Sequence, residues 1–400
     1  MSHDLAQIYD QLFAYCEAED FAGYDPFDGL NSWIFRLSPF NGFAFARLAW
    51  LQAFKRLPFD LRSKFGIGKG LNPKGIALFA LAELSRFRCS GADEHAGNAK
   101  QLIDILLDHR IDAATAGGKT TLAFGYNFDW QSRSFYAPLG TPTIVPTAFA
   151  AQALIQAYEL FGDNRYLTAA NAICEFIVNL LNRPVETTDE LCFSYTPLDR
   201  SVIYNASLLA GECLARVGSI TGDEEYLALA AKTTRFVIHR QNQNGSWAYG
   251  EGDHQKWVDN FHTAYVLLSI WRISSIIPDL RSETLHAIKL GAEYWLDNFF
   301  LEDGTPKYYD ASVYPIDIHS AAVAIAALCE LRPIDDRMLP MARRTAEWTI
   351  SNMRSAEGFF FYQKRKSGTV KIPYMRWGQA WVAYALARLI EAENQANAGD

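Results

Sequence analysis

The stretch Ala321-Ala-Val-Ala-Ile-Ala-Ala-Leu-Cys-Glu-Leu331 decides the fold, because runs of the same kind recur along the chain. It has helical periodicity and one charged side chain in eleven residues, which is typical of a helix buried on nearly all sides. Each related run opens with a polar residue followed by an alanine, and these alanines are Ala148, Ala206, Ala264, Ala321 and Ala380. They lie 58, 58, 57 and 59 residues apart, and a sixth run begins at Ala77, 71 residues before Ala148. The spacing predicts a repeat architecture.

Amphipathic helices are expected between the buried ones. Two of them begin alike, at Gly162-Asp163 and Gly222-Asp223, where the aspartates are predicted N-caps. Alternating aromatics such as Phe193-x-Tyr195 follow the amphipathic segments and predict short strands or hairpins. Buried helices that alternate with half-exposed ones fit a closed ring of two layers, so we predict an all-α (α/α)6 toroid.

The whole chain, residues 1–400, is expected to form one toroid domain. Residues 1–70 contain a predicted helix over about 4–19, the turn-rich segment Gly23-Tyr-Asp-Pro-Phe-Asp-Gly-Leu30 and an aromatic helix over about 43–54. We expect this part to complete or plug the ring. Asp25 and Asp28 are expected only to form Asx-turns within it.

Composition excludes several classes of protein. The chain is 50% hydrophobic and 20% charged, which excludes disorder, and its net charge of −8 without a dense Lys/Arg tract argues against a nucleic-acid partner. Six scattered cysteines without a C-x-x-C pair predict reduced, mostly buried thiols and argue against a zinc site. We expect no metal and no cofactor. The absence of a signal peptide and of a transmembrane segment favours a cytoplasmic location. The oligomeric state stays open.

Polar residues gather just before the inner helices. In a toroid these starts meet at one end, which is the default position for a binding site. The candidate catalytic acids are Glu251, Asp259 and Asp317, because glycoside hydrolysis needs two carboxyl groups that flank the bond. Asp259 and Asp317 fit N-capping equally well.

Two histidines occupy matching repeat positions. His262 and His319 each lie two residues before the repeat alanine, and each follows an aspartate closely. Histidine transfers protons near neutral pH, so this pair, with Tyr374 and Arg376, also fits a lyase or an epimerase that removes a C5 proton from a uronate. Hydrolase and lyase chemistry are therefore not separated by the sequence.

The remaining candidates are predicted to bind substrate. Asp199 and Arg200 form either a local ion pair or a grip on a carboxylate or phosphate. Aromatic side chains can stack on pyranose rings, although about half of them are expected to be core. The full set of predicted binding residues is Asp199, Arg200, Tyr195, Trp247, Tyr249, His254, Tyr309, Tyr362, Arg376 and Trp377.

Five segments resemble a poorly characterised bacterial family of α/α-toroid proteins encoded among cell-surface polysaccharide genes. They are Cys192-Phe-Ser-Tyr-Thr-Pro-Leu-Asp-Arg200, Gly245-Ser-Trp-Ala-Tyr-Gly-Glu-Gly252, Val258-Asp-Asn-Phe-His-Thr263, Tyr314-Pro-Ile-Asp-Ile-His-Ser320 and Tyr374-Met-Arg-Trp-Gly-Gln-Ala-Trp381. The chain is more distantly similar to six-hairpin glycosidases, toroid polysaccharide lyases and sugar epimerases. Gln241-x-x-x-Gly245-x-Trp247 also resembles the Q-W repeat of terpenoid cyclases, but Ile334-Asp-Asp336 lacks the first aspartate of their acid motif.

The resemblance implies a role in glycan assembly or processing. We expect a carbohydrate-active enzyme that acts on a glycan or on an activated intermediate, a sugar nucleotide or lipid-linked sugar, and we slightly favour hydrolysis. The alternatives are a uronate lyase or sugar epimerase, a non-catalytic glycan-binding or scaffold toroid, and an isoprenoid-handling toroid.

Overall fold

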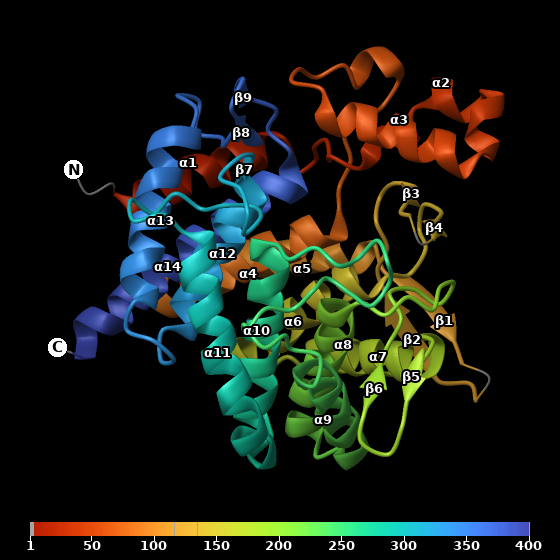
Figure 1. Ribbon diagram of the computed structural model, residues 1–400, viewed down its shortest axis with the longest axis vertical. Helices are drawn as coiled ribbons and strands as arrows, with labels where there is room; N and C mark the ends of the chain where they lie inside the picture. Colours follow the sequence, from red (N-terminus) through yellow and green to blue (C-terminus); the bar gives the residue numbers. More distant parts are fainter. Residues whose placement is uncertain (1–3, 116, 134, 400) are drawn as a thin grey trace.

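Six buried helices form a closed ring in the computed structural model, which describes residues 4–115, 117–133 and 135–399. Each contacts the next one in chain order, and the last contacts the first (Figure 1). Their bounds are α4 (Pro73–Ser90), α6 (Ile144–Phe161), α8 (Tyr204–Thr221), α10 (Asn260–Ile276), α12 (Ile318–Leu331) and α14 (Ala380–Gly399). The repeat alanines Ala77, Ala148, Ala206, Ala264, Ala321 and Ala380 lie within the first five residues of these helices and are fully buried. The predicted toroid is confirmed.

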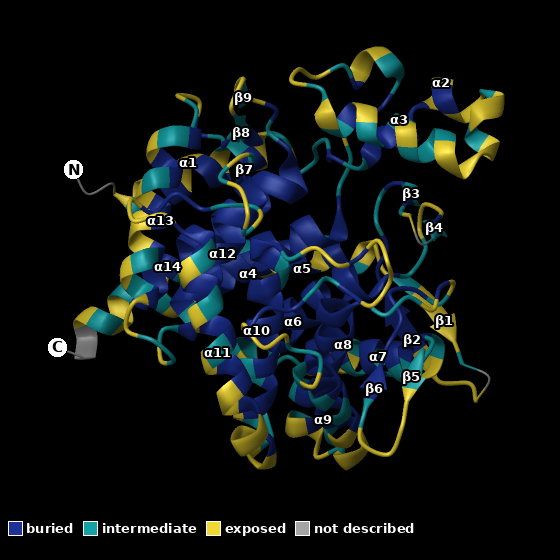
Figure 2. Ribbon diagram, viewed as in Figure 1, coloured by how far each residue is buried: buried dark blue, intermediate teal, exposed yellow. Residues whose placement is uncertain are grey.

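Amphipathic helices make the outer layer, and each pairs with one inner helix. They are α5 (Asp93–Asp108), α7 (Asn164–Leu180), α9 (Glu224–Ile238), α11 (Arg281–Phe299) and α13 (Met338–Met353), while α1 (Leu5–Ala18) packs against α14. Asp163 and Asp223 cap α7 and α9 through their side chains, as predicted. Figure 2 shows the expected consequence, with buried residues concentrated on the inner helices and exposed ones on the outer helices.

Short strands connect the helices. They form the antiparallel pairs β1 (Ile111–Ala114) with β2 (Thr120–Ala123), β3 (Trp130–Gln131) with β4 (Tyr136–Ala137), and β5 (Val185–Glu186) with β6 (Leu191–Cys192). A three-stranded sheet joins β7 (Ile316–Asp317), β8 (Gln363–Arg365) and β9 (Gly368–Val370). A turn of π-helix, Met375–Gln379, precedes α14 and carries Arg376 and Trp377. Within the described residues, no helix is long and apolar enough to cross a membrane.

An N-terminal segment lies apart from the helical layers (Figure 1). It comprises α2 (Trp33–Arg36), α3 (Ala44–Arg56) and the 3-10 turns Asp28–Asn31, Pro39–Gly42 and Ser63–Phe65. Its small core contains Leu30, Phe35 and Leu51.

Two buried ion pairs anchor this segment. Asp28 lies 2.7 Å from Nε of Arg62, and Asp25 accepts two hydrogen bonds from the guanidinium of Arg376 at 2.6 and 2.7 Å. The expectation that Asp25 and Asp28 only form turns was too narrow, because each also neutralises an arginine that is distant in sequence. Asp25 thereby ties the segment to the π-helical turn of the ring.

Candidate active site

A cavity of about 440 Å³ opens at the end of the ring where the inner helices begin. Every repeat contributes to its wall at or just before an inner helix. These residues are Lys74, Val145, Asn205, Phe261, His262, His319, Arg376 and Trp377. The other side is closed by α3, through Leu48, Leu51, Gln52 and Lys55, and by loops rich in aromatic side chains. The segment containing α3 is therefore part of the site.

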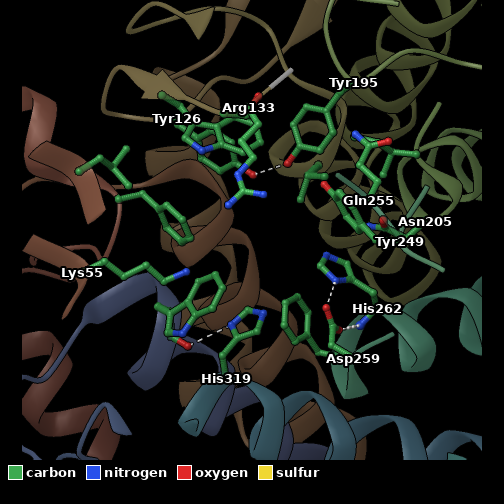
Figure 3. Close-up of a pocket in the computed structure, with 18 of the residues that line it drawn as sticks. Lys55, Tyr126, Arg133, Tyr195, Asn205, Tyr249, Gln255, Asp259, His262 and His319 are labelled. Carbon is green, nitrogen blue, oxygen red and sulfur yellow. Dashed lines mark hydrogen bonds and ion pairs between the residues drawn. The ribbon is translucent and has the colours of Figure 1, made fainter. Parts of the chain in front are cut away.

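His262 is held by a carboxylate on one side and faces the cavity on the other (Figure 3). Its Nδ1 lies 2.6 Å from Oδ2 of Asp259, and the same carboxylate caps α10 by accepting the backbone N–H of His262 at 2.9 Å. Nε1 of Trp257 also donates to Oδ2, at 3.0 Å. A carboxylate on Nδ1 favours the tautomer that leaves Nε2 unprotonated, so His262 presents a proton acceptor to the cavity.

His319 borders the same cavity from the next inner helix (Figure 3). Its Nδ1 lies 3.1 Å from the backbone oxygen of Trp377, which can only accept, so Nδ1 carries the proton. Nε2 then accepts from the hydroxyl of Tyr265 at 3.2 Å. Burial, with smaller contributions from Lys74 and Arg376, holds the pKa of His319 well below its usual range. A neutral imidazole is the form required of a general base.

Four basic side chains line the cavity, and among the described lining residues Asp259 is the only carboxylate. Lys74 projects from α4, and its Nζ lies 3.4 Å from Oη of Tyr265 and 4.4 Å from the ring centre of Phe149. Burial, followed by the charge of Arg376, lowers the pKa of Lys74 well below its usual range.

Lys55 extends into the cavity from α3, with its Nζ 4.4 Å from the ring centre of Phe27 (Figure 3). Burial lowers the pKa of Lys55 as well. Neither Lys55 nor Lys74 forms a salt bridge with a described residue. Arg133 adds a charge at the exposed rim, whereas Arg376 is already paired with Asp25. These basic side chains make the cavity suitable for a ligand with a carboxylate or phosphate group, because such a ligand favours the charged form of the two buried lysines.

Aromatic rings form much of the remaining wall. Tyr249 and Trp257 stack with their ring centres 4.7 Å apart, and Tyr126 shares a hydrogen bond of 2.8 Å with Tyr195. Such flat surfaces with a polar edge suit pyranose rings. The lining aromatics include Tyr126, Trp130, Tyr195, Tyr249, Trp257, Tyr308, Tyr309 and Trp377.

The cavity brings together nine of the residues that the sequence singles out. These are Asp259, His262, His319, Tyr195, Tyr249, His254, Tyr309, Arg376 and Trp377. Asp317 lies behind this wall. It is buried, caps α12 and accepts a hydrogen bond of 2.9 Å from Nε1 of Trp377, and burial raises its pKa to about 6.

Other candidates do not line the cavity, and each has a different contact. Glu251 is exposed and forms a salt bridge of 2.7 Å with Arg240. Tyr374 is buried beside Arg62, with the guanidinium 4.7 Å from its ring centre, and Tyr362 packs edge-on against it.

Asp199, Arg200 and Trp247 also lie elsewhere. Asp199 accepts hydrogen bonds from Thr196 and Ser201 and thereby orders its own loop, while Arg200 is exposed and donates to a backbone oxygen at 3.4 Å. No salt bridge joins Asp199 to Arg200 within the described chain, so the local ion pair is not formed. The Trp247 indole is core and donates to the backbone oxygen of Val237 at 3.0 Å.

Several cavity residues escaped the sequence analysis. Lys74 lies three residues before Ala77, close to the repeat position of the two histidines, so extending that comparison to the first repeat would have found it. Tyr265 lies one residue after Ala264 and was hidden in an apolar run. Lys55 and Arg133 had no such signal, because they come from the N-terminal segment and from the β3–β4 loop.

The fold is similar to those of several solved structures. Cellobiose 2-epimerase from Bacillus thermoamylovorans is 12% identical, with 83% of this chain and 90% of that chain covered and a TM-score of 0.63. The GH76 α-mannanase from Bacteroides thetaiotaomicron is 14% identical, with 82% and 88% covered and a TM-score of 0.57. An unsaturated glucuronyl hydrolase specific for heparin is 15% identical, with 82% and 89% covered and a TM-score of 0.56. No protein-family model and no curated protein sequence matches the chain.

These structures are carbohydrate-active enzymes, and a polysaccharide lyase is also among the similar ones. At such low identities the likeness establishes the fold, an α/α toroid of the class used by sugar epimerases, hydrolases and lyases. The reaction has to be argued from the cavity itself.

Proposed function

We propose that this protein is a carbohydrate-active enzyme that transfers protons at a carbon atom of an anionic sugar, as a sugar epimerase or a uronate lyase does. The observation that carries the proposal is the pair His262 and His319, which border one cavity and each have Nδ1 engaged by an acceptor. His262 therefore offers Nε2 for proton transfer, and Nε2 of His319 is linked to the cavity-lining hydroxyl of Tyr265, through which a proton can pass. Two such groups can serve as the base and the acid of one reaction.

The chemistry needs an acidic carbon. One histidine removes the proton next to a carboxylate or carbonyl group, and the electron pair moves onto the oxygen, which a cation stabilises. Return of a proton to the opposite face gives the epimer, and loss of the group at the β-carbon gives an unsaturated sugar. Lys55, Lys74 and Arg133 are the cations available for the negatively charged group.

We favour proton transfer over the hydrolysis that the sequence slightly favoured. Hydrolysis uses two carboxyl groups separated by about 5–10 Å on either side of the scissile bond. Among the described lining residues only Asp259 is a carboxylate, and it is occupied by His262 and Trp257. Hydrolysis remains the second candidate because the pKa of Asp317, raised to about 6, would suit a general acid if Trp377 moved aside.

The proposed substrate class is supported by the cavity and by the sequence. The cationic, aromatic wall supports an acidic sugar such as a uronate, or a sugar that carries phosphate. The resemblance to proteins encoded among cell-surface polysaccharide genes supports a glycan, sugar nucleotide or lipid-linked sugar from that chemistry. The similar cellobiose 2-epimerase supports the compatibility of this fold with epimerisation and contributes nothing further.

Two histidine variants test the proposal. We expect His262→Asn and His319→Asn each to lower kcat by about 10²-fold or more on uronate oligosaccharides or sugar nucleotides followed by proton NMR. His286→Asn is the matched control, because His286 is exposed on α11 and lies outside the cavity. Full turnover by both cavity variants, with stability unchanged, would contradict the proposal.

A further inference from the structure

The N-terminal segment carries an unusual exposed apolar tip. Residues 33–45 contain six large apolar side chains that are exposed: Trp33, Ile34, Leu37, Phe40, Phe43 and Phe45. The most exposed are Phe45 at 83% and Leu37 at 79%. They lie on α2, on the 3-10 turn Pro39–Gly42 and at the start of α3, where Figure 2 shows exposed residues over most of the ribbon. We call these six residues the apolar tip.

The segment that carries the apolar tip lies apart from the ring (Figure 1). Beneath the tip the segment has a small core of Leu30, Phe35 and Leu51, with Trp50 packed against it, which is too thin to bury a second apolar face. In Figure 1, α2 and the start of α3 point away from the helical layers. Exposed apolar patches of this kind mark sites of interaction with a protein or with a membrane.

The charge of the segment is opposite to that of the whole chain. Residues 33–64 include six basic residues and one acidic residue, although the chain carries a net charge of −8. Of the six, Arg62 is buried against Asp28 and Lys55 lines the cavity. Arg36, Arg56 and Lys64 are exposed, and Arg36 forms a salt bridge with Asp129. Basic side chains next to Trp, Phe and Leu are the pattern of a surface that binds an anionic lipid membrane, because rings enter the acyl boundary while cations meet phosphate.

We propose that the apolar tip docks this protein onto the surface of an anionic phospholipid membrane. Phe43 and Phe45 enter the boundary between headgroups and acyl chains, and the exposed basic residues of the same segment, Arg36, Arg56 and Lys64, contact the lipid phosphates. Because α3 also lines the cavity through Leu48, Gln52 and Lys55, a membrane bound at the tip lies beside the cavity mouth. This docking is independent of the reaction assigned to the cavity.

Vesicle co-sedimentation tests the docking. Phosphatidylcholine vesicles with and without one quarter phosphatidylglycerol are mixed with the full chain at low salt. We expect binding to the anionic vesicles, weakened by added salt, and a loss of at least about tenfold in the partition constant for the double variant Phe43→Ser/Phe45→Ser. The control Leu285→Ser/Leu301→Ser removes two exposed leucines far along the chain, on and just after α11, and should bind as the wild type does.

Three results would overturn the docking. One is the absence of wild-type binding to anionic vesicles, and another is undiminished binding by the Phe43/Phe45 double variant. The third is a concentration-dependent dimer that this variant abolishes while vesicles bind neither protein, which would assign the tip to a second copy of the chain. A melting temperature equal to that of the wild type, expected for exposed residues, excludes unfolding as the cause of lost binding.

Discussion

Replacing Asp259 with asparagine separates helix capping from the orientation of His262. In the wild type the backbone nitrogen of His262 lies 2.9 Å from Oδ1 of Asp259. The side-chain oxygen of asparagine can accept the same hydrogen bond, and asparagine caps helices as well as aspartate does. The amide nitrogen takes the place of Oδ2, which lies 2.6 Å from Nδ1 of His262. An amide N–H₂ group donates and does not accept, so the hydrogen bond from Nδ1–H is lost.

The expected effect is large on turnover and small on stability. Without its acceptor, the imidazole favours the tautomer with the proton on Nε2 and presents a donor to the cavity, so kcat should fall by about 10²- to 10⁴-fold. The loss of one charge-assisted hydrogen bond should cost at most about 3 kcal/mol of unfolding free energy. Nε1 of Trp257, which loses its acceptor too, belongs to a residue that is 39% exposed and can bond to water.

The assay compares kcat, KM and thermal stability on the anionic sugar that the wild type turns over. Asp223→Asn is the matched control, because Asp223 caps the outer helix α9 in the same way with no histidine beside it. Asp259→Asn and His262→Asn should not be additive, since the aspartate acts through the histidine. Two results would refute the reasoning. One is an unchanged kcat in Asp259→Asn. The other is a double variant whose kcat is lower than that of His262→Asn by the same factor that Asp259→Asn causes alone.

Three further predictions follow from burial and charge. Lys55→Met should raise KM for an anionic sugar by about 10-fold or more, because a charge-assisted contact contributes about 1.5–3 kcal/mol to binding. The control Lys289→Met, on the exposed face of α11, should leave KM unchanged. The pKa of His319 lies well below its usual range in the folded protein, so the unfolded chain takes up a proton first as the pH falls below about 6.5. The unfolding free energy should therefore decrease by up to about 1.4 kcal/mol for each pH unit below that value. In urea titrations, His319→Asn should reduce this dependence on pH. Asp317, with a pKa of about 6, makes the unfolding free energy change with pH in the opposite direction between about pH 4 and 6. The quantity to measure is therefore the difference in pH dependence between the wild type and His319→Asn. The same pH dependence in both proteins would contradict the prediction. Gly291→Ala should lower the unfolding free energy by about 1–3 kcal/mol, because the added Cβ would lie 2.5 Å from the Trp247 ring. The control Gly97→Ala has open space around the added Cβ. In the same denaturation experiment it should be neutral or stabilising by up to about 1 kcal/mol.

The repeat spacing predicted the ring because every inner helix obeys one physical rule. A helix that packs between two inner neighbours and an outer helix must be apolar on nearly all faces, and Ala321 to Leu331 is so in sequence and in structure. The same periodicity put His262 and His319 at one end of the ring, since equal positions in successive repeats share a level. Repeats therefore carry positional information about side chains that are far apart in sequence.

The cavity wall outside the repeats could not be predicted in this way. Lys55 reaches the site from a segment whose fold depends on long-range ion pairs, Asp28 with Arg62 and Asp25 with Arg376, and local sequence does not encode such pairs. Glu251 illustrates the opposite case. It follows an aromatic loop in a promising position, but Arg240 of the preceding helical turn holds it at the surface.

Isotope incorporation during turnover tests the assigned chemistry most directly. The reaction is run in D₂O and, separately, in water enriched in ¹⁸O, and the recovered sugar is examined by NMR and mass spectrometry. An epimerase predicts deuterium on a sugar carbon, and a uronate lyase predicts an unsaturated product whose former acidic carbon carries no hydrogen. Neither reaction places ¹⁸O at the anomeric centre, and both products should be lost in His262→Asn and His319→Asn. The appearance of ¹⁸O at the anomeric centre without carbon-bound deuterium would contradict the account and would instead identify a glycoside hydrolase.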